Sequence, residues 1–220
     1  MGPGRGGSLT DDRSLAGDPA SGSALAAMPM AQFQRWFAAA AAAGQPEPEA
    51  MSLATVGPGG VPSARFVLLR GADERGFTFY TNYRSPKAQE VDANPAAALA
   101  FRWATLDRQV RASGRVEVAS PAESDAYFAS RPRPSQLGAW ASEQSQVIGS
   151  RQELESRLAE MERRFAGAEV PRPPWWGGLR VVPAVVEFWQ GRAGRLHDRI
   201  RYRQGDGPEG VNWTMQRLAP

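Results

Sequence analysis

The only histidine of this 220-residue chain, His197, lies between Arg195 and Arg199. It belongs to residues 187–203, where apolar and polar residues alternate on either side of a glycine-containing turn. This pattern predicts a β-hairpin that carries cations. Cations on strands beside an imidazole that can exchange protons suit an anionic substrate, such as a phosphate ester, better than a packed interior. A solvated strand face is the alternative interpretation.

A second candidate for chemistry is Lys87, the only lysine among 26 basic residues. Ser85 can cap a helix, Pro86 suits its first position, and Asn94 followed by proline ends it. Lys87 is then in the first turn, where the positive end of the helix dipole disfavours a cation unless an anion is bound. It is therefore either a phosphate ligand or an exposed lysine.

A third candidate is the polar stretch RPRPSQLGAWASEQSQ at residues 131–146, which we expect to be a loop. Such a loop can surround an anion with its polar side chains, which are Arg131, Arg133, Ser135, Gln144 and Ser145.

Composition limits the remaining possibilities. A chain of this length with 42% hydrophobic residues can form one sizeable domain, and we expect it over residues 28–220, after a disordered leader at residues 1–27. The absence of cysteine excludes thiolate metal sites, and one histidine cannot form a histidine-based zinc cluster, so we expect no metal. Basic residues are scattered among 23 acidic ones, which argues against nucleic acid as a partner. No apolar run is long enough to cross a membrane, and we expect a cytoplasmic protein.

These residues must be positioned by a fold that the pattern predicts to be mainly β with helices, of the α+β class. We expect helices at residues 30–43 and 86–94, and two more opened by the capping pairs Ser120/Glu123 and Ser150/Glu153. The last should pack its apolar face, Leu154, Leu158, Met161 and Phe165, on the sheet. Strands are expected at residues 51–56, 61–69, 77–82, within 96–118, at 179–189 and at 211–220. Many antiparallel strands with few helices predict a β-barrel with helices packed outside.

Ten blocks along the chain carry a specific resemblance: ARFVLL, FYTN, SPKA, DRQV, YFASRPRPSQLGAWAS, EQS, WWGG, EFWQG, RLHDR and the terminal RLAP. In this order they resemble the pyridoxine/pyridoxamine 5'-phosphate oxidase family, flavoenzymes that make pyridoxal 5'-phosphate. The resemblance covers about residues 30–220 and implies an antiparallel, FMN-binding split β-barrel. It also implies a homodimer with one FMN at each of two sites between the subunits. The implied reaction is hydride transfer from C4' of the phosphorylated pyridine substrate to FMN, with oxygen as acceptor and hydrogen peroxide as product.

The resemblance also assigns residues. Those implied to bind FMN are Arg65, Phe66, Val67, Leu68, Leu69, Arg70, Tyr80, Thr81, Lys87, Gln109, Gln144, Ser145, Trp189 and Arg199. Those implied to bind the substrate are Arg70, Tyr127, Arg131, Ser135, Arg195 and His197. Arg195 and His197 are the implied catalytic residues, which orient the ring and tune proton movement.

The chain departs from the family at several positions. Arg70 stands where the family has lysine, Pro86 where it usually has an arginine on the FMN phosphate, and Glu47 where it tends to have aspartate. The leader also lacks the tyrosine that closes over the substrate in the family. Two alternative functions follow: a phenazine-oxidase-like flavoenzyme acting on another substrate, and a non-catalytic flavin- or haem-binding split barrel. The intact Tyr127, Arg131 and Ser135 favour the phosphorylated vitamers.

Overall fold

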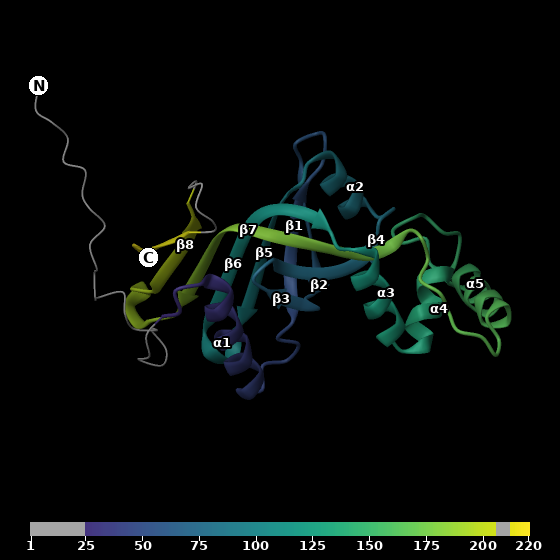
Figure 1. Ribbon diagram of the computed structural model, residues 1–220, viewed down its shortest axis with the longest axis horizontal. Coiled ribbons are helices and arrows are strands. Elements are labelled where there is room, and N and C mark those ends of the chain that lie inside the picture. The colour runs from purple at the N-terminus through teal and green to yellow at the C-terminus, as the bar shows by residue number, and fades with distance from the viewer. Residues whose placement is uncertain (1–24, 206–211) are drawn as a thin grey trace, which may run out of the picture.

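The computed structural model describes residues 25–205 and 212–220. In these residues, one antiparallel sheet of nine strands is accompanied by five α-helices (Figure 1). The helices are α1 (Pro29–Ala42), α2 (Pro86–Ala93), α3 (Pro121–Ser130), α4 (Arg133–Ala141) and α5 (Arg151–Arg164), with short 3-10 turns η2 (Ala104–Leu106) and η3 (Ala193–Arg195). The strands are β1 (Ala50–Val56), β2 (Pro62–Leu68), β3 (Gly71–Asp73), β4 (Gly76–Asn82), β5 (Ala96–Trp103), β6 (Arg108–Val118), β7 (Trp176–Gln190), β8 (Asp198–Gln204) and β9 (Trp213–Leu218). The predicted mainly β, antiparallel fold is confirmed.

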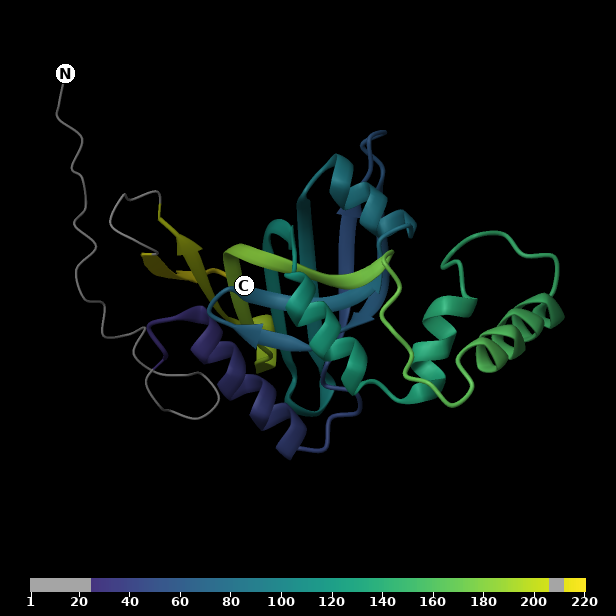
Figure 2. The same cartoon turned by 45° about the vertical axis from the view of Figure 1, so that its right-hand side comes forward.

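A two-residue corner curls the sheet into a barrel. The strand order is β2-β1-β5-β6-β7-β4-β3, and its end strands β2 and β3 are joined by only Leu69 and Arg70. The Leu69 N–H donates to the Glu49 carbonyl beside β1 at 2.9 Å, whereas the Arg70 N–H donates to the Thr78 carbonyl of β4 at 2.8 Å. The chain thus changes partner from one end of the sheet to the other within two residues. Figure 2 shows the curled sheet, with the purple helix α1 beside it.

Strand β7, with 15 residues, connects the two ends of the molecule. It pairs with β6 over residues 179–190, with β4 over residues 176–181 and with β8 over residues 185–190. The register shifts between Ser113 and Gly114 of β6, opposite Pro183. A Cβ added at Gly114 would lie 1.9 Å from the Val182 carbonyl oxygen. Glycine therefore permits the close approach of the two strands at this bulge, where a proline without an N–H is tolerated.

Aromatic residues fill the barrel, and α1 covers one opening. Phe33 and Trp36 of α1 are each 1% exposed, and Phe33 packs edge-on against Phe77 at 4.9 Å between ring centroids. Trp36 packs edge-on against Phe188 of β7 at 5.2 Å. Burial of each such side chain stabilises the fold by about 1.5–3 kcal/mol. The apolar residues whose helical spacing predicted α1 therefore form the face of the helix that packs on the core.

Helices α3, α4 and α5 lie together beside the barrel, on the right in Figure 1. The prediction of a loop over residues 131–146 was wrong in part, because α4 occupies Arg133–Ala141 and buries Leu137 in a second apolar cluster with Phe128 and Phe165. The prediction that α5 packs on the sheet was also wrong. It packs against α4, and none of its residues is fully buried.

The two predicted capping pairs differ in detail. Ser120 and Glu123 form the complete reciprocal box at the start of α3. At α5, Ser150 accepts from the Glu153 N–H, but the Glu153 carboxylate accepts from the Gly149 N–H instead of from Ser150. Both pairs nevertheless open helices, as predicted.

Residues 1–24 of the predicted leader lie outside the described residues. Its last residues contact the barrel. The Ala26 N–H donates to Gln32 Oε1 at 3.1 Å, and the Ala26 carbonyl accepts from the Tyr202 hydroxyl at 2.8 Å. Among the described residues, no helix is long and apolar enough to cross a membrane.

Candidate active site

A cavity of about 610 Å³ opens between the β2–β3 corner, the end of β4, and helices α3 and α4. Its volume lies in the range of small-ligand sites. It is lined by twelve residues predicted to bind FMN or substrate, namely Arg65, Phe66, Val67, Leu68, Arg70, Tyr80, Thr81, Lys87, Tyr127, Arg131, Ser135 and Gln144. The sequence did not predict two others, Pro132 and Trp176.

Lys87 lies in this cavity, and its hydrogen-bond partners in the described part of the chain are all neutral. Its ammonium donates to Gln144 Oε1 at 3.1 Å, to Ser85 Oγ at 3.3 Å and to Thr81 Oγ1 at 3.4 Å. No carboxylate of the described residues forms an ion pair with it. Burial, and next the charge of Arg65, lower the pKa of Lys87. An anion in the cavity would supply the missing counter-charge.

Arg65, in contrast, is held by a carboxylate. Its guanidinium donates to Glu90 of α2 at 3.1 Å, and to Ser63 and Thr55. The Thr55 hydroxyl also donates to Glu90, and this hydrogen bond is the largest cause of the lowered pKa of that carboxyl. Glu90 thus fixes the Arg65 side chain on the cavity wall and balances its charge.

Tyr127, Arg131 and Ser135 line the part of the cavity formed by α3 and α4. The Tyr127 ring stacks on Tyr80 at 3.9 Å between centroids. The Arg131 guanidinium lies 4.7 Å from the centroid of the Trp176 ring, and its Nη1 is buried without a hydrogen-bond partner in residues 25–205 and 212–220. Burial lowers the pKa of Arg131. A buried donor without an acceptor costs about 1–3 kcal/mol, so this position favours an anionic ligand.

Five other predicted residues form a second cluster on the β7–β8 hairpin and the adjacent strand β6. Gln109, Trp189 and Arg199 are neighbours on β6, β7 and β8. Arg199 donates to Glu187 at 2.9 Å. The His197 ring packs on Trp189 at 4.5 Å, and its Nδ1 accepts the Arg192 N–H at 3.1 Å. Exposed Arg195 lies on the connecting turn with φ 62°. The predicted hairpin is confirmed.

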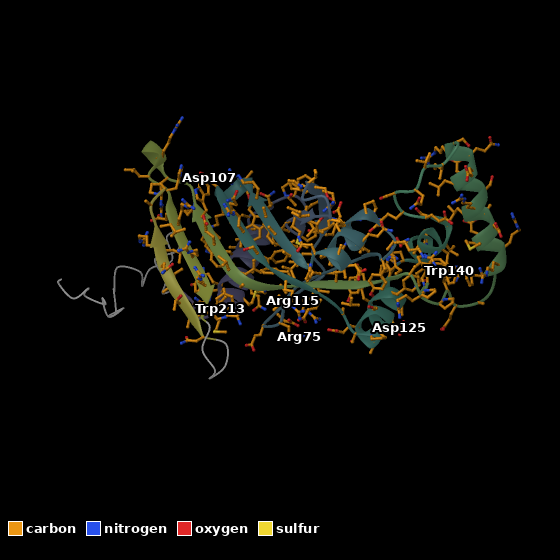
Figure 3. All side chains as sticks on the ribbon, turned by 90° about the horizontal axis from the view of Figure 1, so that it is seen from above. Arg75, Asp107, Arg115, Asp125, Trp140 and Trp213 are labelled. Atoms are coloured by element: carbon orange, nitrogen blue, oxygen red, sulfur yellow. The ribbon has the colours of Figure 1, made fainter. Side chains whose placement is uncertain are left out.

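The two clusters lie at opposite ends of the molecule. Thr81 pairs with Gly177 near the start of β7, whereas Trp189 is near its end. The strand between them spans roughly 40 Å along its path. Figure 3 shows the same separation, with Trp140 of α4 at one end and Trp213 of β9 at the other. One chain therefore does not bring the hairpin residues to the cavity.

Three further residues lie outside the cavity lining. Leu69 is 7% exposed and belongs to the barrel core. Ser145 is exposed on the loop after α4 and has φ 70°, next to Gln144, which does line the cavity. Arg133, considered as an anion ligand, instead donates to the Phe165 and Ala168 carbonyls and ties α4 to the turn after α5.

Comparison with known proteins decides the family. A family profile described as pyridoxamine 5'-phosphate oxidase matches residues 37–165. A relative from Rubrobacter xylanophilus, a pyridoxine/pyridoxamine 5'-phosphate oxidase, is 60% identical over 192 residues, which are 87% of each chain. This chain belongs to the pyridoxamine 5'-phosphate oxidase family. A relative of the same name from Synechocystis is 57% identical over 87% of this chain and 88% of its own. A second profile, the pyridoxine 5'-phosphate oxidase C-terminal dimerisation region, matches residues 176–220 of this family member.

Solved structures agree on the fold. PhzG from Burkholderia lata, crystallised with tetrahydrophenazine-1-carboxylic acid, has a TM-score of 0.83 with this family member. It is 31% identical over 89% of this chain and 94% of its own. An FMN-binding protein from Nostoc punctiforme, related to pyridoxamine 5'-phosphate oxidase, has a TM-score of 0.68 at 21% identity, over 86% of this chain and 97% of its own. The predicted split barrel of the family is thereby confirmed.

Besides Pro132, sequence reasoning missed two residues that shape the cavity of this family member. Glu90 lies one helical turn after Lys87 but pairs with Arg65, 25 positions earlier in the chain, so local spacing did not indicate its role. Trp176 precedes Gly177 and Gly178, and a Cβ at Gly178 would lie 3.0 Å from Tyr80 Cε1. An aromatic residue followed by two glycines was the available signal for close aromatic packing.

Proposed function

We propose that this protein is an FMN-dependent oxidase that converts pyridoxine 5'-phosphate or pyridoxamine 5'-phosphate to pyridoxal 5'-phosphate. The observation that carries the proposal is a single cavity with two separate cationic positions that have no carboxylate partner among the described residues. Lys87 marks one, and Arg131, with its buried unpaired Nη1, marks the other. Two such positions suit two phosphate groups, one of the cofactor and one of the substrate.

The cofactor phosphate is assigned to the α2 side of the cavity. Lys87 and Arg65 would hold it, with Thr81 and Gln144 as hydrogen-bonding neighbours. The Ser85 Oγ accepts from Lys87 rather than capping α2, which helps to hold the lysine at this side of the cavity. Bound FMN would supply acceptance of a hydride from C4' of the substrate and transfer of its two electrons to oxygen, which with two protons gives hydrogen peroxide. With pyridoxamine 5'-phosphate, water supplies the aldehyde oxygen and the amino group leaves as ammonia.

The substrate phosphate is assigned to Arg131, Tyr127 and Ser135, with Arg70 at the β2–β3 corner nearby. A planar guanidinium can bind phosphate through two hydrogen bonds, which fixes direction as well as position. Holding the phosphate fixes C4' relative to the cofactor, and near-attack positioning can contribute about 7–11 kcal/mol of barrier reduction.

The hairpin residues are assigned to the partner subunit of a homodimer. Gln109, Trp189 and Arg199 would complete the cofactor site of the other chain, where Arg195 and His197 would orient the substrate ring. Three observations support this: the roughly 40 Å path along β7, the named dimerisation region at residues 176–220, and Phe66, which is 80% exposed on β2 at the cavity. The Arg192 N–H on Nδ1 leaves Nε2 of His197 free for the substrate.

We further propose that residues 28–220 form a single functional domain and that the enzyme works in the cytoplasm. Separate purification of residues 25–220 tests the first point. This fragment keeps the Ala26 contacts with Gln32 and Tyr202 and should unfold in one transition with unchanged turnover.

Oxygen uptake by FMN-loaded protein tests the main proposal. We expect consumption of oxygen with pyridoxine 5'-phosphate and with pyridoxamine 5'-phosphate, together with formation of pyridoxal 5'-phosphate. Full FMN occupancy without oxidation of either compound would refute it. Turnover of a reduced phenazine carboxylic acid instead would establish the alternative that resemblance to PhzG suggests.

A further inference from the structure

Trp176, the first residue of β7, contacts both halves of the assigned phosphate clamp. Its indole is 7% exposed and lines the cavity. The Arg131 guanidinium lies 4.7 Å from its ring centroid, and the Tyr127 ring is nearly parallel to it, at 6.2 Å and 6°. We propose that Trp176 is a positioning residue that holds Arg131 and Tyr127 in the geometry that binds the substrate phosphate. This inference rests on the proposed function.

Arg131 needs such a partner because the other aromatic ring near its guanidinium, that of Phe128 at 5.6 Å, is more distant than Trp176 at 4.7 Å. Its backbone N–H donates to the Phe128 carbonyl at 3.2 Å, but the buried Nη1 has no acceptor among the described residues. The charge of Arg70 also acts on it, and with burial this lowers its pKa. The face of an indole attracts a guanidinium without using its N–H donors, so a cation–π contact holds the side chain while leaving its hydrogen bonds for a ligand.

Trp176 is itself rigidly placed. Its N–H donates to the Pro173 carbonyl at 3.1 Å, and its carbonyl accepts from the Arg172 guanidinium at 2.6 Å. The ring packs edge-on against Phe128 at 5.1 Å. Because the indole is fixed by β7 and by its packing against Phe128, it can limit the motion of the Arg131 side chain, whose guanidinium also lies 5.6 Å from the Phe128 ring centroid.

The contacts predict an effect on substrate rather than on cofactor. The cofactor-side residues Lys87 and Arg65 have hydrogen bonds of their own and do not contact Trp176. Tyr80 stacks on Trp176 at 5.5 Å, but it is also held by Tyr127 at 3.9 Å. Loss of the indole should therefore disturb the substrate phosphate first.

The test compares Trp176→Leu with Trp176→Phe and with Trp140→Leu as a matched control. Trp140 lies outside this cavity, and its indole also carries an arginine, Arg164, at 5.0 Å. Two quantities are measured on FMN-loaded protein: the KM for pyridoxine 5'-phosphate, and the Kd for pyridoxal 5'-phosphate from equilibrium titration. FMN affinity of the apoprotein is measured separately.

For Trp176→Leu we expect KM and Kd to rise about tenfold, with kcat and FMN affinity changed less than about threefold. Trp176→Phe keeps an aromatic face, so its KM and Kd should rise less than those of Trp176→Leu. Trp140→Leu should leave KM and Kd unchanged. The inference is overturned if folded Trp176→Leu binds pyridoxal 5'-phosphate like wild type, or if FMN affinity falls as much as substrate affinity. Because the Kd requires no turnover, it judges this inference even if the wild-type protein proves not to be an oxidase.

Discussion

Replacing Lys87 with methionine should weaken FMN binding without destabilising the apoprotein. The lysine is partly buried, has three neutral acceptors, and has its pKa lowered by burial and by Arg65. Its charge therefore costs free energy in the empty fold and is stabilised only when an anion arrives. Methionine removes the charge and keeps an unbranched chain.

The magnitude follows from the kind of contact that is lost. A hydrogen bond to a charged group contributes about 1.5–3 kcal/mol, which corresponds to a roughly 10- to 150-fold rise in the Kd for FMN. The apoprotein should lose no stability, because Thr81 still donates to Gln144 at 3.0 Å after the ammonium is gone. A loss of FMN affinity without a loss of folding stability distinguishes a ligand-binding lysine from a structural one.

Two titrations provide the assay: flavin fluorescence as apoprotein is added to FMN, and urea unfolding of the apoprotein. Arg84→Met is the control, because it removes a positive charge from the same end of α2 while its guanidinium lies over Trp175, outside the cavity. It should leave the Kd for FMN within about threefold of wild type. Equal FMN affinity in wild type and Lys87→Met would refute the assignment of the cofactor phosphate.

Three further perturbations follow from the same structure. Arg131→Leu should raise the KM for pyridoxine 5'-phosphate roughly 10- to 150-fold with FMN affinity kept, and an unchanged KM would place the substrate phosphate elsewhere. Gly114→Ala should lower the free energy of unfolding in urea by about 3 kcal/mol, because the new Cβ would meet the Val182 carbonyl, whereas Gly138→Ala, with open space around it, should not destabilise. Hydrogen bonds from Ser120 lower the pKa of Glu123 from 4.5 to about 2, so this carboxylate stabilises the fold above pH 4.5 and the contribution is lost as the pH falls towards 2. Glu123→Gln should flatten the dependence of Tm on pH in that window, and an unaltered slope would show that another group is responsible.

The sequence predicted correctly those helices and strands that are specified by their own apolar spacing or capping residues. The spacing of Phe33 and Trp36 identified α1, and Ser85 with Pro86 located the start of α2 and hence Lys87. Helix α4 was missed because Pro132, Pro134 and Gly138 are typical of loops, and it is stabilised by burial of Leu137 in a cluster assembled from distant segments. Tertiary packing overrode local composition there.

The sequence predicted most residues of the candidate site, but not how those residues are arranged in space. The resemblance assigned both Arg131 and His197 to the substrate, but a sequence does not show how far apart two residues lie. The strand pairing shows that the length of β7 separates them. Trp176 and Glu90 were missed for a related reason. Their roles depend on which cation each one contacts, and those contacts join residues 45 and 25 positions apart, between Arg131 and Trp176 and between Arg65 and Glu90.

The length of β7 has a genetic consequence. Suppose that each active site combines the cavity of one chain with the hairpin of the other. An allele defective at Arg131 then damages the cavity half of a site, and an allele defective at His197 damages the hairpin half. A mixed dimer then contains one site built from two intact halves and one site that carries both defects. With random pairing, about one quarter of all sites would be wild type, so two inactive alleles in one cell would complement each other.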